Sequence, residues 1–339
     1  MSRLAILLLS LIIVSSLLDS CQHESRQYAV GFYYWKTQVI LNSIERSAMD
    51  SIQTGPMAVR YFDLDIDTRS GLVSPIAPVS FDSVHCLKIA EPVIFIKNRI
   101  FHERTDSAIA MWAVQTTALI RKINIDNGIV ENKVIQLDCD WTVSTRDAFF
   151  FFIEKMKQAN PRVEIISTVR LHQIKFKDTM GVPPVNRAVL MYYNMGKIEC
   201  GQGNSILDNS IGETYLGNLK SYPLPLDWAL PTFYWAIRCD QGHVISLISK
   251  TSREELTPPY FSQINPDQYQ VERDHNFKGI WIEKGQVLKV EESTIADLHL
   301  ALKLLEKYSD ESPQKIYLFD LDSLNIVKYN QFIHEFSKH

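Results

Sequence analysis

Strand-like and helix-like patterns alternate along the chain after its first 27 residues. Short runs of β-branched, aromatic and aliphatic residues are typical of buried strands, and longer segments with apolar residues every three or four positions are typical of amphipathic helices. The strand-like runs occupy residues 28–34, 57–65, 92–98, 134–139, 163–169, 188–194, 226–235 and 315–323. The pattern therefore predicts eight strands.

Helix-like segments separate most of these strands. Their spacing predicts helices over residues 39–52, 106–123, 211–219, 294–308 and 327–336, and another after Ser144. Thr105 or Asp106 suits the cap of the second helix, and Ser144 with Asp147 makes a start similar to a capping box. Alternation of strand and helix predicts an α/β fold with parallel strands, and closure into a (β/α)8 TIM-type barrel is the simplest arrangement. An open doubly wound sheet is the alternative, but the chain has no glycine-rich first turn.

One long segment interrupts this order. Residues 240–292 lie between strand seven and its helix, and they contain further strand-like runs at 243–249 and 279–290. We expect an insertion packed on the rim of the barrel. The barrel domain would then span residues 28–339.

The amino terminus has the pattern of an export signal. Arg3 precedes an apolar run from Leu4 to Leu18, which is short for a membrane span and typical of a signal peptide. The run ends in "LDSC", which resembles a bacterial lipobox. We therefore expect a signal peptide over residues 1–20, lipidation of Cys21, a linker over 21–27 and anchoring to a membrane of the bacterial cell envelope. The alternative is a secreted protein cleaved nearby.

Composition excludes several classes of function. Hydrophobic residues make up 46% of the chain and charged residues 22%, which suits a large folded core. The net charge is −4 and no basic tract is present, so nucleic acid is a poor partner. No CxxC or HExxH motif occurs, so we expect no metal and no cofactor. We expect a monomer.

Four cysteines follow Cys21. Cys200 and Cys239 each come a few residues after a predicted strand, so they could meet across neighbouring loops and form a disulfide outside the cytoplasm. Free or buried thiols are the interpretation favoured for these two residues. The other two cysteines are Cys86 and Cys139.

Two aspartates end the fourth strand, in "VIQLDCDWTVS". Because strand residues alternate between faces, Gln136, Asp138, Asp140 and Thr142 share one side, and Ile135, Leu137, Cys139 and Trp141 share the other. The polar side would point into the barrel, towards the end where active sites of this fold lie. Two carboxylates about 7 Å apart suit acid–base chemistry. A buried polar network is the structural alternative.

The same segment resembles the strand-four motif of family-18 glycoside hydrolases, the chitinase-like barrels, which reads D-x-x-D-x-D-x-E. "LMYYNMG" is similar to their strand-six segment M-x-Y-D, and "WALPTFYW" to their strand-seven segment. The resemblance covers most of the chain after the signal, and it extends to bacterial envelope lipoproteins with a chitinase-like barrel. It implies a barrel directed at glycans.

Four positions depart from that family's pattern. The glutamate that protonates the leaving oxygen is replaced by Thr142, and three other family positions hold Ile135, Asn194 and Phe319. The resemblance implies that Asp140 and Tyr193 keep the role of orienting an acetamido group. The proton donor, however, is missing, so we do not expect chitinase chemistry.

A relocated acid would restore hydrolysis. Two carboxyls about 5 to 9.5 Å apart are needed, and the candidates are Asp138, Asp140, Asp63, Asp320 and Asp322. For the last three the alternative is an ordinary capping aspartate. Asn194 would bind substrate, and five aromatic residues near strand ends could stack on sugar rings: Tyr34, Trp35, Tyr193, Tyr234 and Trp235.

Three functions remain open. The first is a glycan-binding barrel without catalysis, the second is an active glycoside hydrolase with a relocated acid, and the third is an assembly lipoprotein that binds a protein. A cleft lined by aromatics and carboxylates would favour the first two, and a mouth plugged by the insertion would favour the third.

Overall fold

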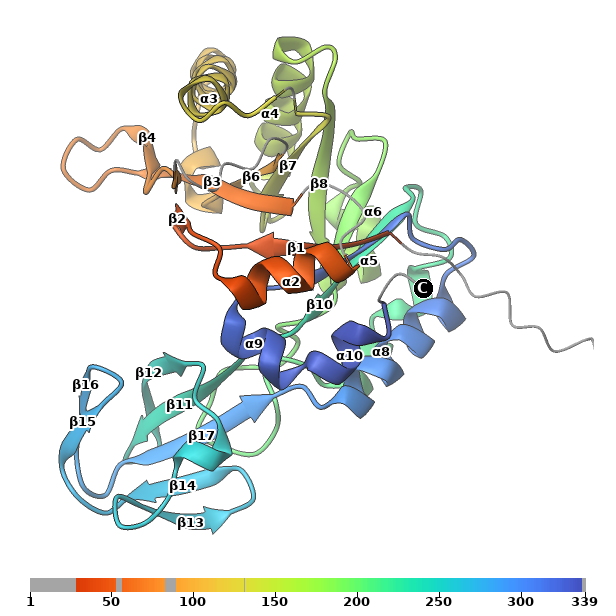
Figure 1. Cartoon of the computed structure of the whole chain (residues 1–339). Helices are drawn as coiled ribbons and strands as arrows, with labels where there is room; N and C mark the ends of the chain where they lie inside the picture. Colours follow the sequence, from red (N-terminus) through yellow and green to blue (C-terminus); the bar gives the residue numbers. More distant parts are fainter. Residues whose placement is uncertain (1–28, 53–56, 83–89, 131, 337–339) are drawn as a thin grey trace, which may run out of the picture.

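The computed structural model describes residues 29–52, 57–82, 90–130 and 132–336, and its largest part is a closed parallel barrel (Figure 1). Around the ring the strands follow the order β1-β18-β10-β9-β8-β7-β6-β3, and pairing of β1 with β3 closes it. Their bounds are β1 Ala29–Tyr34, β3 Met57–Ile66, β6 Ala90–Ile96, β7 Val134–Cys139, β8 Glu164–Arg170, β9 Ala188–Met191, β10 Leu226–Pro231 and β18 Lys315–Phe319. The predicted (β/α)8 barrel is confirmed.

Helices cover the outside of the ring and connect most of the successive strands, although the described residues between β3 and β6 contain none. They are α2 Ser43–Ile52, α3 Asp106–Asp126, α4 Arg146–Ala159, α5 Leu171–Lys175, α6 Lys177–Met180, α7 Asn209–Glu213, α8 Ile295–Tyr308, α9 Ser323–Lys328 and α10 Asn330–His334. Short 3-10 turns occur at Asn98–Phe101, Leu216–Asn218 and Arg253–Glu255. Three short strands border the barrel: β2 Gln38–Val39, β4 Val73–Ile76 and β5 Ser80–Phe81.

Several element boundaries differ from the sequence prediction. The helix expected over 39–52 begins at Ser43, because residues 38–39 pair with β5 as strand β2. The cap at Thr105 is confirmed, since its side chain accepts a hydrogen bond from the Ala108 amide. Helix α4 begins one residue later than expected, with Thr145 at the cap. The single last helix is wrong: residues 323–334 form α9 and α10, with Tyr329 between them.

Two apolar cores lie on opposite sides of the barrel strands. Ile135, Leu137 and Cys139 belong to the outer core between the strands and the helices. A smaller cluster fills the barrel interior: Tyr33, Ala58, Val93, Ile166, Val189, Met191, Tyr193, Ala229 and Tyr317. The hydroxyl of Tyr33 donates to Gln136 Oε1 at 2.7 Å, so Gln136 lies inside. The predicted facing of β7 is therefore confirmed for residues 135–139.

The insertion is an antiparallel sheet beside the barrel (Figure 1). Its strands are β11 Tyr234–Asp240, β12 His243–Ser249, β13 Phe261–Asn265, β14 Gln268–Val271 and β17 Val287–Glu292, in the order β12-β11-β17-β14-β13, with a hairpin of β15 His275–Phe277 and β16 Ile280–Ile282. The insertion begins at Tyr234, earlier than the expected residue 240. Predicted strand seven, 226–235, is divided because β10 ends at Pro231 and β11 pairs with β12 and β17 instead.

A disulfide ties the insertion to the loop after β9. Cys200 and Cys239 are joined, with their Cα atoms 6.0 Å apart. The preference for free thiols at these two positions is therefore wrong. The loop and the insertion already pack together, because Gln268 Nε2 donates to the Cys200 carbonyl at 2.8 Å and Asn204 Nδ2 donates to the Glu292 carbonyl at 2.7 Å. Cys139 is a buried free thiol.

The predicted signal peptide, Cys21, the linker 21–27 and Cys86 lie outside the described residues. Across the described segments, none of the helices is long and apolar enough to cross a membrane.

Candidate functional site

A cavity of about 390 Å³ opens at the carboxyl ends of the barrel strands, and we call it the mouth cavity. Residues from seven barrel strands or the loops that follow them line it. Trp35 follows β1, Asp138 lies near the end of β7, Arg170 ends β8 and Phe319 ends β18. Ser249 and Lys250 come from the insertion, which therefore forms one wall of the cavity and does not fill it.

Aromatic rings form a continuous surface in the mouth cavity. The ring centroids of Trp35 and Phe319 are 5.2 Å apart, those of Tyr193 and Phe319 are 5.6 Å apart, and those of Phe233 and Trp235 are 5.3 Å apart. Each contact holds the next ring in place, so the surface is rigid. Six rings of this chain of contacts line the cavity: Trp35, Phe95, Tyr193, Phe233, Trp235 and Phe319.

Asp138 lies in the mouth cavity as part of an ion pair. Its side chain is 5% exposed, and Arg170 Nη2 is 3.4 Å from Oδ1. Thr168 Oγ1 donates to the same oxygen at 2.7 Å. Among the described residues, both contacts go to Oδ1, which leaves Oδ2 for a ligand. Alternation along β7 thus brings Asp138 to the cavity as the sequence predicts.

Asp140 is separated from Asp138 and lies in a second, smaller cavity. Its side chain is 59% exposed, and Oδ1 is 3.9 Å from Nε2 of His172. This side cavity has a volume of about 220 Å³ and shares Arg170, Tyr193 and Asn194 with the mouth cavity. The two cavities are therefore neighbouring parts of one cleft, and Asp140 lies at its solvent-exposed end.

Thr142 takes no part in either cavity. It is exposed in the turn after β7, and its hydroxyl lies 3.0 Å from that of Ser144 and 3.2 Å from that of Thr145. The position that holds the family's glutamate is thus a helix-entry turn here.

Asp320 lies opposite Asp138 in the mouth cavity. Asn325 Nδ2 donates to its Oδ1 at 2.6 Å and to its carbonyl oxygen at 3.3 Å, which fixes the carboxyl group. Burial raises the pKa of Asp320 to about 6, with a further contribution from Asp322, while Lys250 and Lys36 oppose the rise. Asp320 therefore exchanges its proton near neutral pH.

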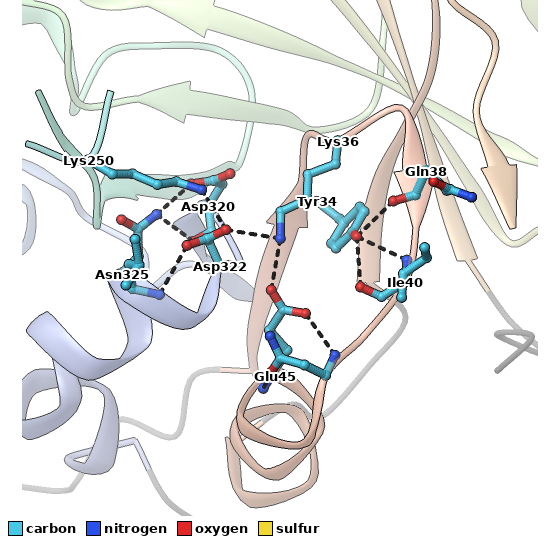
Figure 2. A network of polar contacts seen from close by, with 11 residues as sticks. Tyr34, Lys36, Gln38, Ile40, Glu45, Lys250, Asp320, Asp322 and Asn325 are labelled. Carbon is cyan, nitrogen blue, oxygen red and sulfur yellow. Dashed lines mark hydrogen bonds and ion pairs between the residues drawn. The ribbon is translucent and has the colours of Figure 1, made fainter. Parts of the chain in front are cut away.

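Asp322, two residues further on, has the opposite environment (Figure 2). Lys36 Nζ is 2.9 Å and Lys250 Nζ is 2.5 Å from its Oδ2, and Oδ1 accepts from the Leu324 amide at the start of α9. Burial acts to raise the pKa of Asp322, but the two lysines outweigh it and lower the pKa. Asp322 is a capping aspartate, which was the structural alternative for this residue.

Lys36 joins this network to helix α2, because its Nζ also lies 2.8 Å from Glu45 Oε1 (Figure 2). The network thereby connects the loop after β1, the insertion and the loop after β18. It fixes the position of Lys250 at the cavity wall.

Two predicted residues lie away from the cavities. Asp63 on β3 pairs with Arg60, whose Nε donates to its Oδ1 at 2.7 Å, and it lines neither cavity. Tyr34 is fully buried, and its hydroxyl donates to the Gln38 carbonyl at 2.9 Å. Since side chains alternate along β1, Tyr34 faces the outer core.

The other predicted binding residues do meet at the mouth cavity: Tyr193, Asn194, Tyr234 and Trp235. Burial raises the pKa of Tyr193, so its hydroxyl stays neutral. Asn194 is exposed and has a positive φ of 55°, which turns the chain after β9. Trp235 Nε1 donates to Glu291 Oε2 at 3.1 Å, and Tyr234 is largely buried beside it on β11.

The opposite end of the barrel holds a second group of buried charges, the basal network. Glu91, near the start of β6, accepts a hydrogen bond from the Tyr317 hydroxyl at 2.6 Å, lies 3.1 Å from Lys315 Nζ and also accepts from Gln136. Asp227 pairs with Arg187 and accepts from the Lys315 amide at 2.8 Å. This buried polar network includes Gln136 but neither Asp138 nor Asp140, the two residues for which the sequence left a buried polar network open as the alternative.

Sequence reasoning missed Arg170, Lys36, Lys250 and Asn325. Arg170 ends a predicted strand, so its place at the mouth could have been inferred from strand alternation. Lys250 and Asn325 carry no such signal, because the path of the insertion and of the last helices brings them to the cavity. In the described portion, no group of three or more histidine, cysteine or acidic side chains is placed to hold a metal ion.

Comparisons with known families and with curated protein sequences find no match. The fold is similar to solved structures. The spore cortex-lytic enzyme SleL of Bacillus cereus superposes with a TM-score of 0.51 at 15% identity, over 88% of this chain and 72% of SleL. A chitinase from Bacteroides thetaiotaomicron gives a TM-score of 0.45 at 11% identity, over 92% of this chain and 99% of that enzyme. A xylanase–α-amylase inhibitor protein, XAIP-III, gives a TM-score of 0.47 at 8% identity, over 91% of this chain and 97% of the inhibitor. The likeness to SleL shows a shared (β/α)8 barrel fold.

Proposed function

We propose that this protein is a lipid-anchored protein of the bacterial cell envelope whose barrel mouth binds a saccharide. The observation that carries the proposal is the mouth cavity, where a rigid aromatic surface lies next to hydrogen-bonding groups. The C–H faces of sugar rings are apolar and stack on such rings, while their hydroxyls need polar partners at the edge.

The polar edge suits hydroxyl groups. Asn325 is 1% exposed and lines the cavity, yet its Oδ1 has no hydrogen-bond donor among the described residues. That oxygen has almost no accessible surface, so the polar groups open to a ligand are others in the lining: the side chains of Asp138, Arg170 and Lys250 offer acceptors and donors to hydroxyls. The ring of Tyr193 also lines the cavity, and its neutral hydroxyl donates to Met191 Sδ at 3.0 Å.

The cavity also favours a saccharide over a protein partner. A mouth plugged by the insertion would favour an assembly role, whereas here the insertion supplies one wall and leaves about 390 Å³ open. A concave site with aromatic walls and few polar groups is typical of small-molecule recognition. Carbohydrate binding is thus better supported than assembly.

Binding is tested with the full-length chain in a detergent that has no sugar headgroup. A glycan array, followed by calorimetric titration of the saccharides that bind, would measure affinity for wild type, Trp35→Ala and Trp281→Ala. We expect Trp35→Ala to weaken binding at least tenfold, since it removes the stacking surface. Trp281 is 57% exposed on β16 and lines neither cavity, so its replacement should change nothing. Absence of any bound saccharide, or equal losses in both variants, would contradict the proposal.

The envelope location has separate support. The lipobox-like "LDSC" and the apolar run before it come from the sequence, and the Cys200–Cys239 disulfide suits an oxidising compartment. We expect Cys21→Ser to lose incorporated lipid and to leave the membrane fraction in cells. Equal membrane retention of this variant would contradict lipid anchoring.

A further inference from the structure

Two carboxyl groups line the mouth cavity from opposite sides of the barrel. Asp138 lies on β7 and Asp320 follows β18, and these strands are four positions apart in a closed ring of eight. They are therefore on opposite sides of the barrel, and both side chains line the same cavity. The interior of an eight-stranded barrel is narrow, so a ligand in this cavity would lie between them.

The two groups have different surroundings. Asp138 is held by a cation, Arg170, and by Thr168, and its Oδ2 is left for a ligand. Asp320 is partly buried and is held by the amide of Asn325, with its pKa raised to about 6. Acid–base hydrolysis requires two carboxyl groups whose environments give them different pKa values, so that one is protonated while the other is ionised.

Neighbouring acids are less suitable. Asp322 is bound by two lysines and the start of α9, so its carboxylate is occupied (Figure 2). Asp140 is 59% exposed and lies in the side cavity, outside the aromatic surface.

Building on the proposed saccharide binding, we propose that Asp320 is the proton donor and Asp138 the proton acceptor of a glycoside hydrolase. Asp320 gives its proton to the glycosidic oxygen as the bond from that oxygen to the anomeric carbon breaks. A water molecule forms the new bond to the anomeric carbon and gives its proton to Asp138. The products are a new reducing end and a free hydroxyl, and one water is consumed. Proton return from Asp138 to Asp320 through solvent restores the starting state.

This pairing replaces the missing glutamate at position 142 with an acid from the opposite side of the barrel. Thr142 lies in a turn outside both cavities, so restoring a glutamate there would not supply a proton donor to the mouth cavity. Asn325 acts as a positioning residue, because it holds the carboxyl of Asp320.

The test uses the saccharides that bind in the calorimetric experiment. Each is incubated with the full-length protein in ¹⁸O-labelled water, and mass spectrometry counts new reducing ends and their label. We expect one ¹⁸O atom per cleaved bond. Asp320→Asn and Asp138→Asn should each lower the rate at least a hundredfold, as loss of a general acid or base does. Asp126→Asn, at the exposed end of α3, should leave the rate unchanged.

A second measurement separates the two roles. A dinitrophenyl glycoside of the bound sugar has a leaving group that needs no proton, so Asp320→Asn should cleave it at close to the wild-type rate. Asp138→Asn should stay inactive, because water activation is still required. Loss of both activities in Asp320→Asn, in a variant that is at least as stable as wild type to heating, would overturn its role as the acid.

The outcomes also distinguish this inference from the proposed function. Saccharide binding without any cleavage by wild type would overturn hydrolysis and leave the binding function standing. If no saccharide binds, both fail.

Discussion

At the amino-terminal end of the barrel strands, Glu91 is surrounded by donors from Lys315, Gln136 and Tyr317, whereas at the carboxyl-terminal end Asp320 is held by one amide and borders a cavity. Glu91 is buried and Asp320 is partly buried, at opposite ends of the same barrel. The basal network has internal partners for its charges, so its role is to hold the strands together. The mouth retains an acceptor at Asn325 without a donor and an acid with a raised pKa. Polar groups that lack hydrogen-bond partners within the protein, or whose pKa is shifted, are a sign of a ligand site.

The largest effect on stability is expected from replacing Glu91 of the basal network. Glu91→Leu deletes the acceptor shared by three buried donors, and we expect the free energy of unfolding to fall by about 3 to 5 kcal/mol. Chemical denaturation would measure it. The double variant Glu91→Leu/Lys315→Met replaces the ion pair with apolar groups and should recover part of the loss. A Glu91→Leu variant as stable as wild type would show that the basal network is not structural.

The disulfide tests how firmly the mouth wall is held. Replacing Cys200 and Cys239 with serine removes a cross-link between residues 39 apart, which should cost about 3 to 4 kcal/mol in a chain-entropy account. The insertion contributes Lys250 and Trp235 to the cavity, so saccharide affinity should fall as well. Unfolding curves of wild type with and without reductant provide the matched comparison. If stability and affinity both stay unchanged, contacts other than the disulfide hold the insertion in position.

Asp320→Asn should have the opposite effect on stability from Glu91→Leu. Because the folded protein raises the pKa of Asp320 to about 6, the carboxyl contributes stability that is complete below its unfolded pKa and is lost as pH rises through about 6. Four groups face it from the surrounding elements, namely Lys36, Lys250, Asp322 and Tyr193. The neutral amide removes this loss, so the variant should exceed wild type by about 2 to 3 kcal/mol at pH 8 and match it at pH 4.

Thermal unfolding from pH 4 to pH 8 would check that difference. A constant gap between the two proteins across this range would mean that Asp320 does not titrate there.

The sequence predicted the barrel well, because the strands are continuous apolar runs and most of them are followed by a helix. Strand alternation also placed Asp138 and Gln136 inside, since a period of two leaves no other choice once the outer face packs on helices. The candidate site was predicted only in part. Asp63 ends a strand as Asp138 does, but Arg60 of the same strand neutralises it outside the cavities. The pattern of apolar and polar residues does not predict that Asp63 pairs with Arg60.

Other parts of the site depend on contacts between distant segments. Lys250 reaches Asp322 because the insertion folds back over the mouth, and Asn325 reaches Asp320 because α9 begins at once after β18. The disulfide likewise depends on how the loop after β9 packs on β11. These relations are set by tertiary packing and not by periodicity.

The central claim is that Asp320 belongs to a ligand site and titrates near neutral pH. Carboxyl-carbon NMR of aspartate-labelled protein, with the Asp320 signal assigned by its loss in Asp320→Asn, measures this directly. We expect a titration midpoint near pH 6. Saturation with the bound saccharide should move it upward, because the ligand excludes water from the cavity. A midpoint near 4, or one that the saccharide leaves unchanged, would contradict the account.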